Sequence, residues 1–221
     1  MKILFIFLIK LYELCKIVLY LYSILMCVNR KIMTSKQKDI LQTAKDLFWK
    51  HGVSRVTMEE ISNNAGVSKM TLYKYYSNKK ELALEVLKNE VGKAFTKFEQ
   101  IIHSDMPFEE KLEQMFLMKL EGTKGISKEF LNDIYQNPKL GLYQYIEEQS
   151  RRSTELFKQF LEDSQRQGLI RKDLKIPFVQ HYINQLTGLV TDQHLLAHYN
   201  NPQELIMESM RFMFYGLLPR K

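Results

Sequence analysis

Side chains able to bind a polyanion gather in one short stretch of the sequence. The stretch carries ammonium groups, a hydroxyl and two phenols, contributed by Lys69, Thr71, Tyr73, Lys74 and Tyr75. Ammonium groups and phenols can hydrogen-bond phosphate oxygens, and aromatic rings can pack on a sugar or a thymine methyl. Clustered surface tyrosines usually have a partner, so we predict an interface here. A solvated basic face without a partner is the alternative.

The charge of the chain supports the same prediction. Of a formal net charge of +7, residues 34–80 carry +5, residues 1–33 carry +4 and the remainder carries −2. A basic head therefore precedes a slightly acidic body. That asymmetry is expected when one end of a protein meets a polyanion and the other end meets something else.

Other chemistry has little support in the sequence. We find no Ser/His/Asp order, phosphate loop or dinucleotide fingerprint, so we expect neither an enzyme nor a cofactor. Cys15 and Cys27 are the only cysteines, which argues against a disulfide framework and for the reducing cytoplasm. His194 and His198 have the i, i+4 spacing of metal ligands, with Asp192 nearby. Without a third ligand we predict no metal and a polar role in a dimer interface instead.

The first 32 residues need a separate interpretation. Residues 1–28 are apolar, but Lys10, Glu13 and Lys16 interrupt them, and each charge near a bilayer centre costs roughly 2.5–3.5 kcal/mol. The uncharged stretches are too short to span a membrane. Residues 1–32 are therefore expected to be a misassigned leader, with translation starting at Met33 or, as the second choice, Met26, or a disordered or amphipathic extension. A genuine membrane anchor within residues 1–28 is the remaining alternative.

Helical periodicity begins after Met33 and places the polyanion-binding cluster on a short helix. Thr57 and Glu60 form a capping box at the start of one helix, and Ser68 caps the next one across a turn at Gly66. Leu72, on this second helix, should face the core of the domain. We therefore predict a helix-turn-helix over residues 57–76, with the recognition helix second.

The string from Thr57 to Leu82, T-x-x-x-I-x-x-x-A-G-V-S-K-x-T-L-Y-K-Y-Y-x-N-K-x-E-L, resembles the signature of the TetR/AcrR family of one-component transcriptional regulators. The resemblance implies an all-α fold of about nine helices. It would comprise a helix-turn-helix DNA-binding domain at residues 34–94 and a larger ligand-binding and dimerisation domain at residues 95–221. It also implies that Thr57 and Lys79 hold backbone phosphates and that Met70 contacts a base or sugar.

The body after residue 94 shows helical patterns and no strand-like alternation. Its helices are expected from Pro107, over residues 130–135, 139–167 and 177–200, and from Pro202 to about Leu217. An apolar ligand pocket is predicted from Phe95, Phe98, Met115, Met118, Tyr135 and Tyr143. A dimer interface is predicted from Phe178, Tyr182, Ile183, Leu186, Leu189, Val190, Leu205, Met210, Met213, Phe214 and Leu217.

Together these features predict a cytoplasmic, homodimeric repressor that binds a palindromic DNA operator and is released by a small apolar or aromatic effector. A membrane-tethered regulator is the alternative if residues 1–28 are an anchor. A helical enzyme or scaffold that carries the same head is the third hypothesis. The sequence does not identify the effector or the operator.

Overall fold

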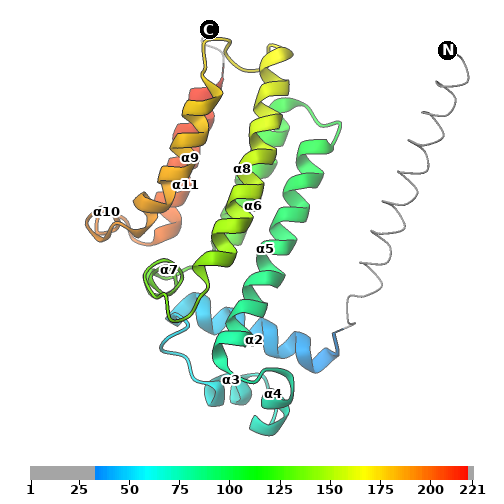
Figure 1. Ribbon diagram of the computed structural model, residues 1–221, viewed down its shortest axis with the longest axis vertical. Helices are drawn as coiled ribbons and strands as arrows, with labels where there is room; N and C mark the ends of the chain where they lie inside the picture. The colour runs from blue at the N-terminus through cyan, green and yellow to red at the C-terminus, as the bar shows by residue number, and fades with distance from the viewer. Residues whose placement is uncertain (1–32, 219–221) are drawn as a thin grey trace, which may run out of the picture. The chain divides into compact units, whose positions relative to one another are not determined.

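The computed structural model describes residues 33–218, except for the side chain of Thr187, and in this part of the chain all regular structure is α-helical (Figure 1). The N-terminal helices are α2 (Ser35–His51), α3 (Met58–Asn64), α4 (Lys69–Tyr75) and α5 (Lys79–His103). They are followed by α6 (Phe108–Gly122), α7 (Lys128–Tyr135), α8 (Tyr143–Arg166), α9 (Ile176–Thr191), α10 (Gln193–Leu196) and α11 (Pro202–Leu217). The chain divides into two units, residues 1–38 and 39–221, and the contacts below lie within the second.

The short helices of the head begin at side-chain caps, as the sequence predicts. The Thr57 hydroxyl accepts a hydrogen bond from Glu60 N at 3.1 Å, and the Ser68 hydroxyl accepts one from Thr71 N at 3.1 Å. Asn78 caps α5 in the same way, through Glu81 N at 2.9 Å. Each cap satisfies one of the N–H groups that a helix start leaves unpaired, and is worth about 1 kcal/mol.

A small core fixes the angle of α4 within the head. Ile40, Phe48, Ile61 and Leu72 are fully buried, each at 0% exposure. Fully burying a side chain of this size contributes about 1.5–3 kcal/mol. Ala65, which the periodicity places in the same core, is only half-buried. The core thus holds α4 through Leu72 and leaves its other faces at the surface.

Hydrogen bonds and one ring contact join the head to α7. The carboxylate of Asp133 on α7 accepts from Ser54 N at 2.8 Å and from the Ser54 hydroxyl. Ser127 N donates to the carbonyl of Trp49 at 2.9 Å. The Trp49 and Phe130 rings lie 4.2 Å apart between centroids. The end of α2, through Trp49, and the loop after it, through Ser54, are therefore both held against the start of α7 and its helix.

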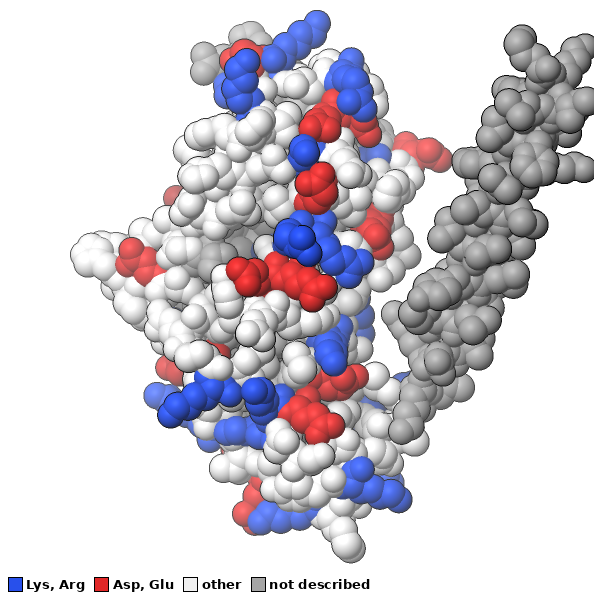
Figure 2. Space-filling view, in the orientation of Figure 1, with Lys and Arg blue, Asp and Glu red and all other residues white. Residues whose placement is uncertain are grey.

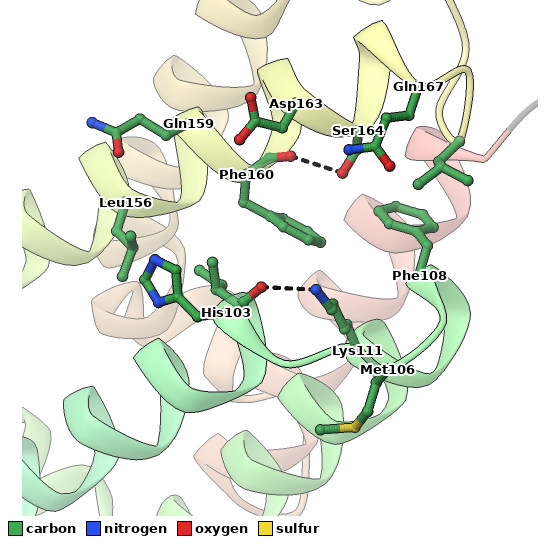
Figure 3. Close-up of a pocket in the computed structure, with 12 residues that line it drawn as sticks. His103, Met106, Phe108, Lys111, Leu156, Gln159, Phe160, Asp163, Ser164 and Gln167 are labelled. Carbon is green, nitrogen blue, oxygen red and sulfur yellow. Dashed lines mark hydrogen bonds between the residues drawn. The ribbon is translucent and has the colours of Figure 1, made fainter.

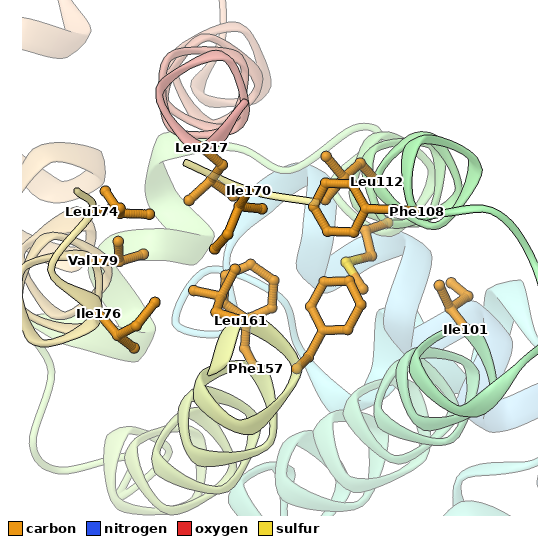
Figure 4. Packing of buried hydrophobic residues seen from close by; sticks show 12 residues of the cluster. Ile101, Phe108, Leu112, Phe157, Leu161, Ile170, Leu174, Ile176, Val179 and Leu217 are labelled. Carbon is orange, nitrogen blue, oxygen red and sulfur yellow. The ribbon is translucent and has the colours of Figure 1, made fainter. Parts of the chain in front are cut away.

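The body packs its helices around a hydrophobic core (Figure 4). Helix α6 contacts α5 and α11, and α8 contacts α5 and α9. The core comprises Ile101, Phe108, Leu112, Met115, Phe157, Phe160, Leu161, Ile170, Leu174, Ile176, Val179 and Leu217. The Phe108 and Phe160 rings stack at 5.6 Å between centroids.

The body differs from the predicted helices at two places. The helix predicted over residues 177–200 is divided, because the Asp192 carboxylate accepts from His194 N at 2.8 Å and so starts the short helix α10. The helix predicted from residue 139 begins at Tyr143 instead, after a turn in which Gly141 has φ +66°. No described helix has the length and apolar character needed to cross a membrane. The interpretations of residues 1–32 fall outside the described residues.

Candidate nucleic-acid interface

Helix α4 presents the predicted contact residues on its outer faces. Leu72 and Tyr76 are buried at 0% and 5%, whereas Met70 is 82% and Tyr73 49% exposed. Lys69 and Lys74 are also exposed, and Thr71 and Tyr75 are half-buried. An apolar residue at 82% exposure is unusual on a helix that has its own core contact. Leu72 is therefore the buried anchor of α4, and Lys69, Met70, Tyr73 and Lys74 are accessible, whereas Thr71 and Tyr75 are only partly so. Their contacts with DNA stay a prediction.

Two candidate residues are held by neighbours in the DNA-free protein. The Lys69 ammonium lies 2.9 Å from the carboxylate of Glu59 on α3, which links the two helices of the motif. The Thr71 hydroxyl lies 2.9 Å from the Ser68 hydroxyl. These contacts orient the side chains before any ligand arrives. To reach a phosphate, Lys69 has to exchange its carboxylate partner for it.

Lys79 has a structural function that the sequence did not reveal. Its ammonium donates to the carbonyls of Ser54 at 2.8 Å and Val56 at 2.7 Å. Burial lowers the pKa of Lys79, although Asp133 nearby acts in the opposite direction. An ammonium has three donors, so one remains for a phosphate. Lys79 therefore fixes the loop between α2 and α3, and its phosphate contact stays a prediction, as does that of Thr57.

Figure 2 shows lysine and arginine side chains at the lower end of the view, where Figure 1 has α3 and α4. Acidic side chains lie among them, and the visible face of the body carries both signs beside wide uncharged areas. The sequence predicts a basic head, with +5 over residues 34–80, and a slightly acidic body. Electrostatic attraction to DNA would therefore act mainly on the head.

The six residues predicted for the ligand pocket lie in several environments. Met115 belongs to the core at 2% exposure, and Met118 packs against that core. Phe98 faces Phe157 at 6.3 Å between ring centroids, and the Arg152 guanidinium lies 4.7 Å from the centre of the Phe95 ring. The remaining pair, Tyr135 and Tyr143, contact each other edge to face at 6.0 Å. Their function as pocket walls stays a prediction.

A pocket of about 240 Å³ lies at the ends of α5, α6 and α8, and none of those six residues lines it (Figure 3). Its walls include Met106, Phe108, Leu156 and Phe160. The polar groups that face it are already paired in part: Lys111 donates to Ile102 O at 2.8 Å, and Ser164 donates to Phe160 O at 2.7 Å. No pattern in the sequence indicates this pocket, because it depends on how the loop between α5 and α6 packs near α8.

Most residues of the predicted dimer interface lie on α9 and α11 with part of their surface exposed, but two require correction. Leu205 and Leu217 are buried at 3% and 1% within the chain, so they pack between helices instead of facing a partner. The most exposed aromatic residues of α11 were missed: Phe212 is 73% and Tyr215 77% exposed. Phe178 on α9 is 65% exposed, as its predicted place at the interface requires.

The two histidines considered as metal ligands contact each other, with ring centroids 5.6 Å apart. Within residues 33–218, no group of three or more His, Cys, Asp and Glu side chains is placed to hold a metal ion.

A helix pair joined at a glycine turn, with a buried anchor and an outer face of lysine and tyrosine, defines a helix-turn-helix DNA-binding protein. Residues 40–86 match the family model described as bacterial regulatory proteins, tetR family. The head is therefore similar to that of the tetR family of bacterial regulatory proteins, and the chain resembles transcriptional regulators over most of its length.

The similarity to known regulators extends over most of the chain, in sequence and in fold. The HTH-type transcriptional repressor KstR2 of Mycobacterium tuberculosis is 23% identical over 160 residues, which cover 70% of this chain and 79% of KstR2. The fatty acid degradation regulator FadR from Bacillus halodurans is similar in structure, with a TM-score of 0.63, 20% identity and coverage of 86% and 100%. FadR from Bacillus subtilis in complex with stearoyl-CoA has a TM-score of 0.59, 19% identity and coverage of 81% and 98%.

Proposed function

We propose that the protein is a homodimeric repressor that binds a palindromic operator through α4 and is released when a small molecule binds in its helical body. The observation that carries the DNA-binding step is the outer face of α4, where Tyr73 and Lys74 are exposed around the buried anchor Leu72. A rigidly seated helix that presents donors and an aromatic ring suits the major groove.

Dimerisation is proposed through α9 and α11. Phe178, Phe212 and Tyr215 leave most of their apolar surface in water, and a cluster of this kind marks an interaction surface. Pairing α9 and α11 with their copies across a two-fold axis would form a four-helix seam. Two heads related by that axis would read two half-sites, separated by about 34–36 Å or a multiple of it.

Release is proposed to travel along α5. This helix has 25 residues, so it is about 37 Å long, with the loop-fixing Lys79 at one end and the core residue Ile101 at the other. A ligand that moves the body end of such a rod also moves the head. The FadR structure with stearoyl-CoA supports an organic effector. The shift is limited by the difference in the ligand's affinity for the two states.

A salt-dependent gel shift on the DNA upstream of the protein's own gene tests the DNA-binding step. Tyr73→Ala and Lys74→Ala should each weaken specific binding by roughly 1–3 kcal/mol, while the control Lys172→Ala, an exposed lysine of the body, should bind as wild type does. Wild-type affinity in Tyr73→Ala would refute the docking of α4. Release is then tested by titrating the operator complex with hits from a thermal-shift screen of hydrophobic compounds.

A further inference from the structure

Helix α6 has one inward-facing residue that is not buried. Leu112, Met115 and Thr123 point into the body and are buried at 6%, 2% and 7%. At 100° per residue, Lys119 projects between Leu112 and Met115, yet its side chain is exposed. Because the turns before and after it are buried, the accessible space beside Lys119 is a local opening in the packing and not the frayed end of the helix.

Helix α8 shows the same pattern independently. Leu142, the residue just before α8, and Phe157 on its inward face are buried at 1% and 6%. Ser150 projects within 20° of Phe157 on a helical wheel by the same rotation of about 100° per residue, and it is exposed. Ser153, one turn later, is half-buried, and its hydroxyl donates to Gln149 O at 3.0 Å. The inward faces of α6 and α8 are thus not covered over one or two turns. The side chains there are the amine of Lys119 and the hydroxyls of Ser150 and Ser153.

Contacts place these openings at one level of the body. Lys97 on α5 pairs with Glu121 on α6 at 3.6 Å, so the turn of Lys119 lies beside the middle of α5. The middle of α5 also meets α8 near Ser150, since Phe95 lies under Arg152. Between residues 87 and 101 of α5, all of them described, only Leu87 and Ile101 are buried. Helices α5, α6 and α8 therefore surround a loosely packed section of the body, and the sections on either side of it along the helices are well packed.

The Lys119 ammonium has no hydrogen-bond or ion-pair partner among the described residues. Its side chain keeps accessible surface, but desolvation by the protein atoms around it lowers its pKa. An ammonium in such surroundings is stabilised by an anion that reaches it. Two other cations at this level are occupied: Lys97 pairs with Glu121, and Arg152 lies over the Phe95 ring and donates to Gln149 Oε1 at 3.1 Å. A site with one unpaired positive charge and neighbouring hydroxyls suits a ligand with a single negative charge better than a ligand with two.

We propose that this level binds an amphipathic monocarboxylate, with the carboxylate on the Lys119 ammonium and the Ser150 hydroxyl and the apolar part along Phe95, Phe98 and Met118. The proposal rests on the proposed function and names the chemical class of its effector. It amends the largely apolar ligand expected from the sequence, because one end of the ligand carries a charge. A pocket wall of aromatic and methionine side chains leaves the length of the apolar part adjustable.

Calorimetric titration with decanoate and 1-decanol, extended to a series of saturated chain lengths, tests the charge directly. The wild-type protein should prefer the carboxylate at least about tenfold at the best chain length. Lys119→Met keeps the length of the side chain and should remove this preference while leaving affinity for the alcohol unchanged. The control Lys124→Met removes the same charge from an exposed lysine just beyond α6 and should behave as wild type does.

Three results would overturn the proposal: equal binding of acid and alcohol by the wild-type protein, retention of the preference in Lys119→Met, or no binding at any chain length. Ser150→Leu gives a second check, because filling the open level should weaken acid and alcohol alike. Circular dichroism and the melting temperature establish that each variant is folded. If carboxylates bind through Lys119 but operator affinity does not change, the site stands and ligand-driven release is refuted.

Discussion

The contact between Asp133 and the loop after α2 yields a prediction that tests how the head is held. Asp133→Ala removes the acceptor of two hydrogen bonds from Ser54, one of them from a backbone N–H at 2.8 Å. Asp133 itself is buried at 7% exposure. Hydrogen bonds to a charged group contribute about 1.5–3 kcal/mol each, but Ser54 is exposed and water can replace part of the loss. We expect the free energy of unfolding to fall by about 2–3 kcal/mol.

Urea denaturation followed by circular dichroism measures this change, with Asp105→Ala as the control because that aspartate is exposed. Ser54→Ala should cost less than Asp133→Ala, since it removes only the hydroxyl donor. The double variant then gives the coupling energy of the pair. If Asp133→Ala unfolds within about 0.5 kcal/mol of wild type, as a surface substitution does, the contact does not hold the head and the argument is wrong.

Three further predictions concern the head, the dimer and the response to acid. Lys79→Met should destabilise the loop that its ammonium fixes and flatten the salt dependence of DNA binding by about one unit; unchanged stability would contradict the first effect, and an unchanged salt slope the second. Phe212→Glu combined with Tyr215→Glu should yield monomers in analytical ultracentrifugation and lose specific operator binding, because both side chains are exposed on the proposed seam; a dimer that persists excludes that face. For Glu90, burial alone would raise the pKa, but hydrogen bonds from two lysines outweigh it and lower the pKa below its ordinary value of 4.5. A lowered carboxyl pKa stabilises the fold above the ordinary value and this contribution is lost as pH falls below it, so the stabilities of wild type and Glu90→Gln should converge below about pH 4.5 and differ at neutral pH.

The sequence predicted the head well because its signals are local. The caps at Thr57 and Ser68 and the glycine between them determine where each helix begins and ends, whatever the rest of the chain does. Gly52 follows the end of α2 with a φ of +80°, which suits a helix stop. The structure adds a second requirement, since a Cβ there would lie 2.8 Å from the Asp133 carboxylate. That contact joins positions far apart in the sequence, and no local pattern reveals it.

The body was predicted less well because its sites depend on which face of each helix is covered. Helix α11 is apolar on both sides, so periodicity selected Leu205 and Leu217, which the chain buries itself, and missed Phe212 and Tyr215. Lys119 carries no sign in the sequence that distinguishes it from an ordinary surface lysine. Only the burial of its neighbours along α6 shows that it faces inward.

The position of Trp49 has a practical consequence for following the protein in solution. It is the only tryptophan of the chain, it is 8% exposed, and its indole N–H has no hydrogen-bond partner. Its ring packs against Phe130 of α7 at a tilt of 33°, at the contact between head and body. Intrinsic fluorescence therefore reports on that single contact: when the head moves away from α7, water reaches the indole and its emission shifts to longer wavelength. Stopped-flow recording can then time the movement of the head separately from the departure of the operator, with no label attached.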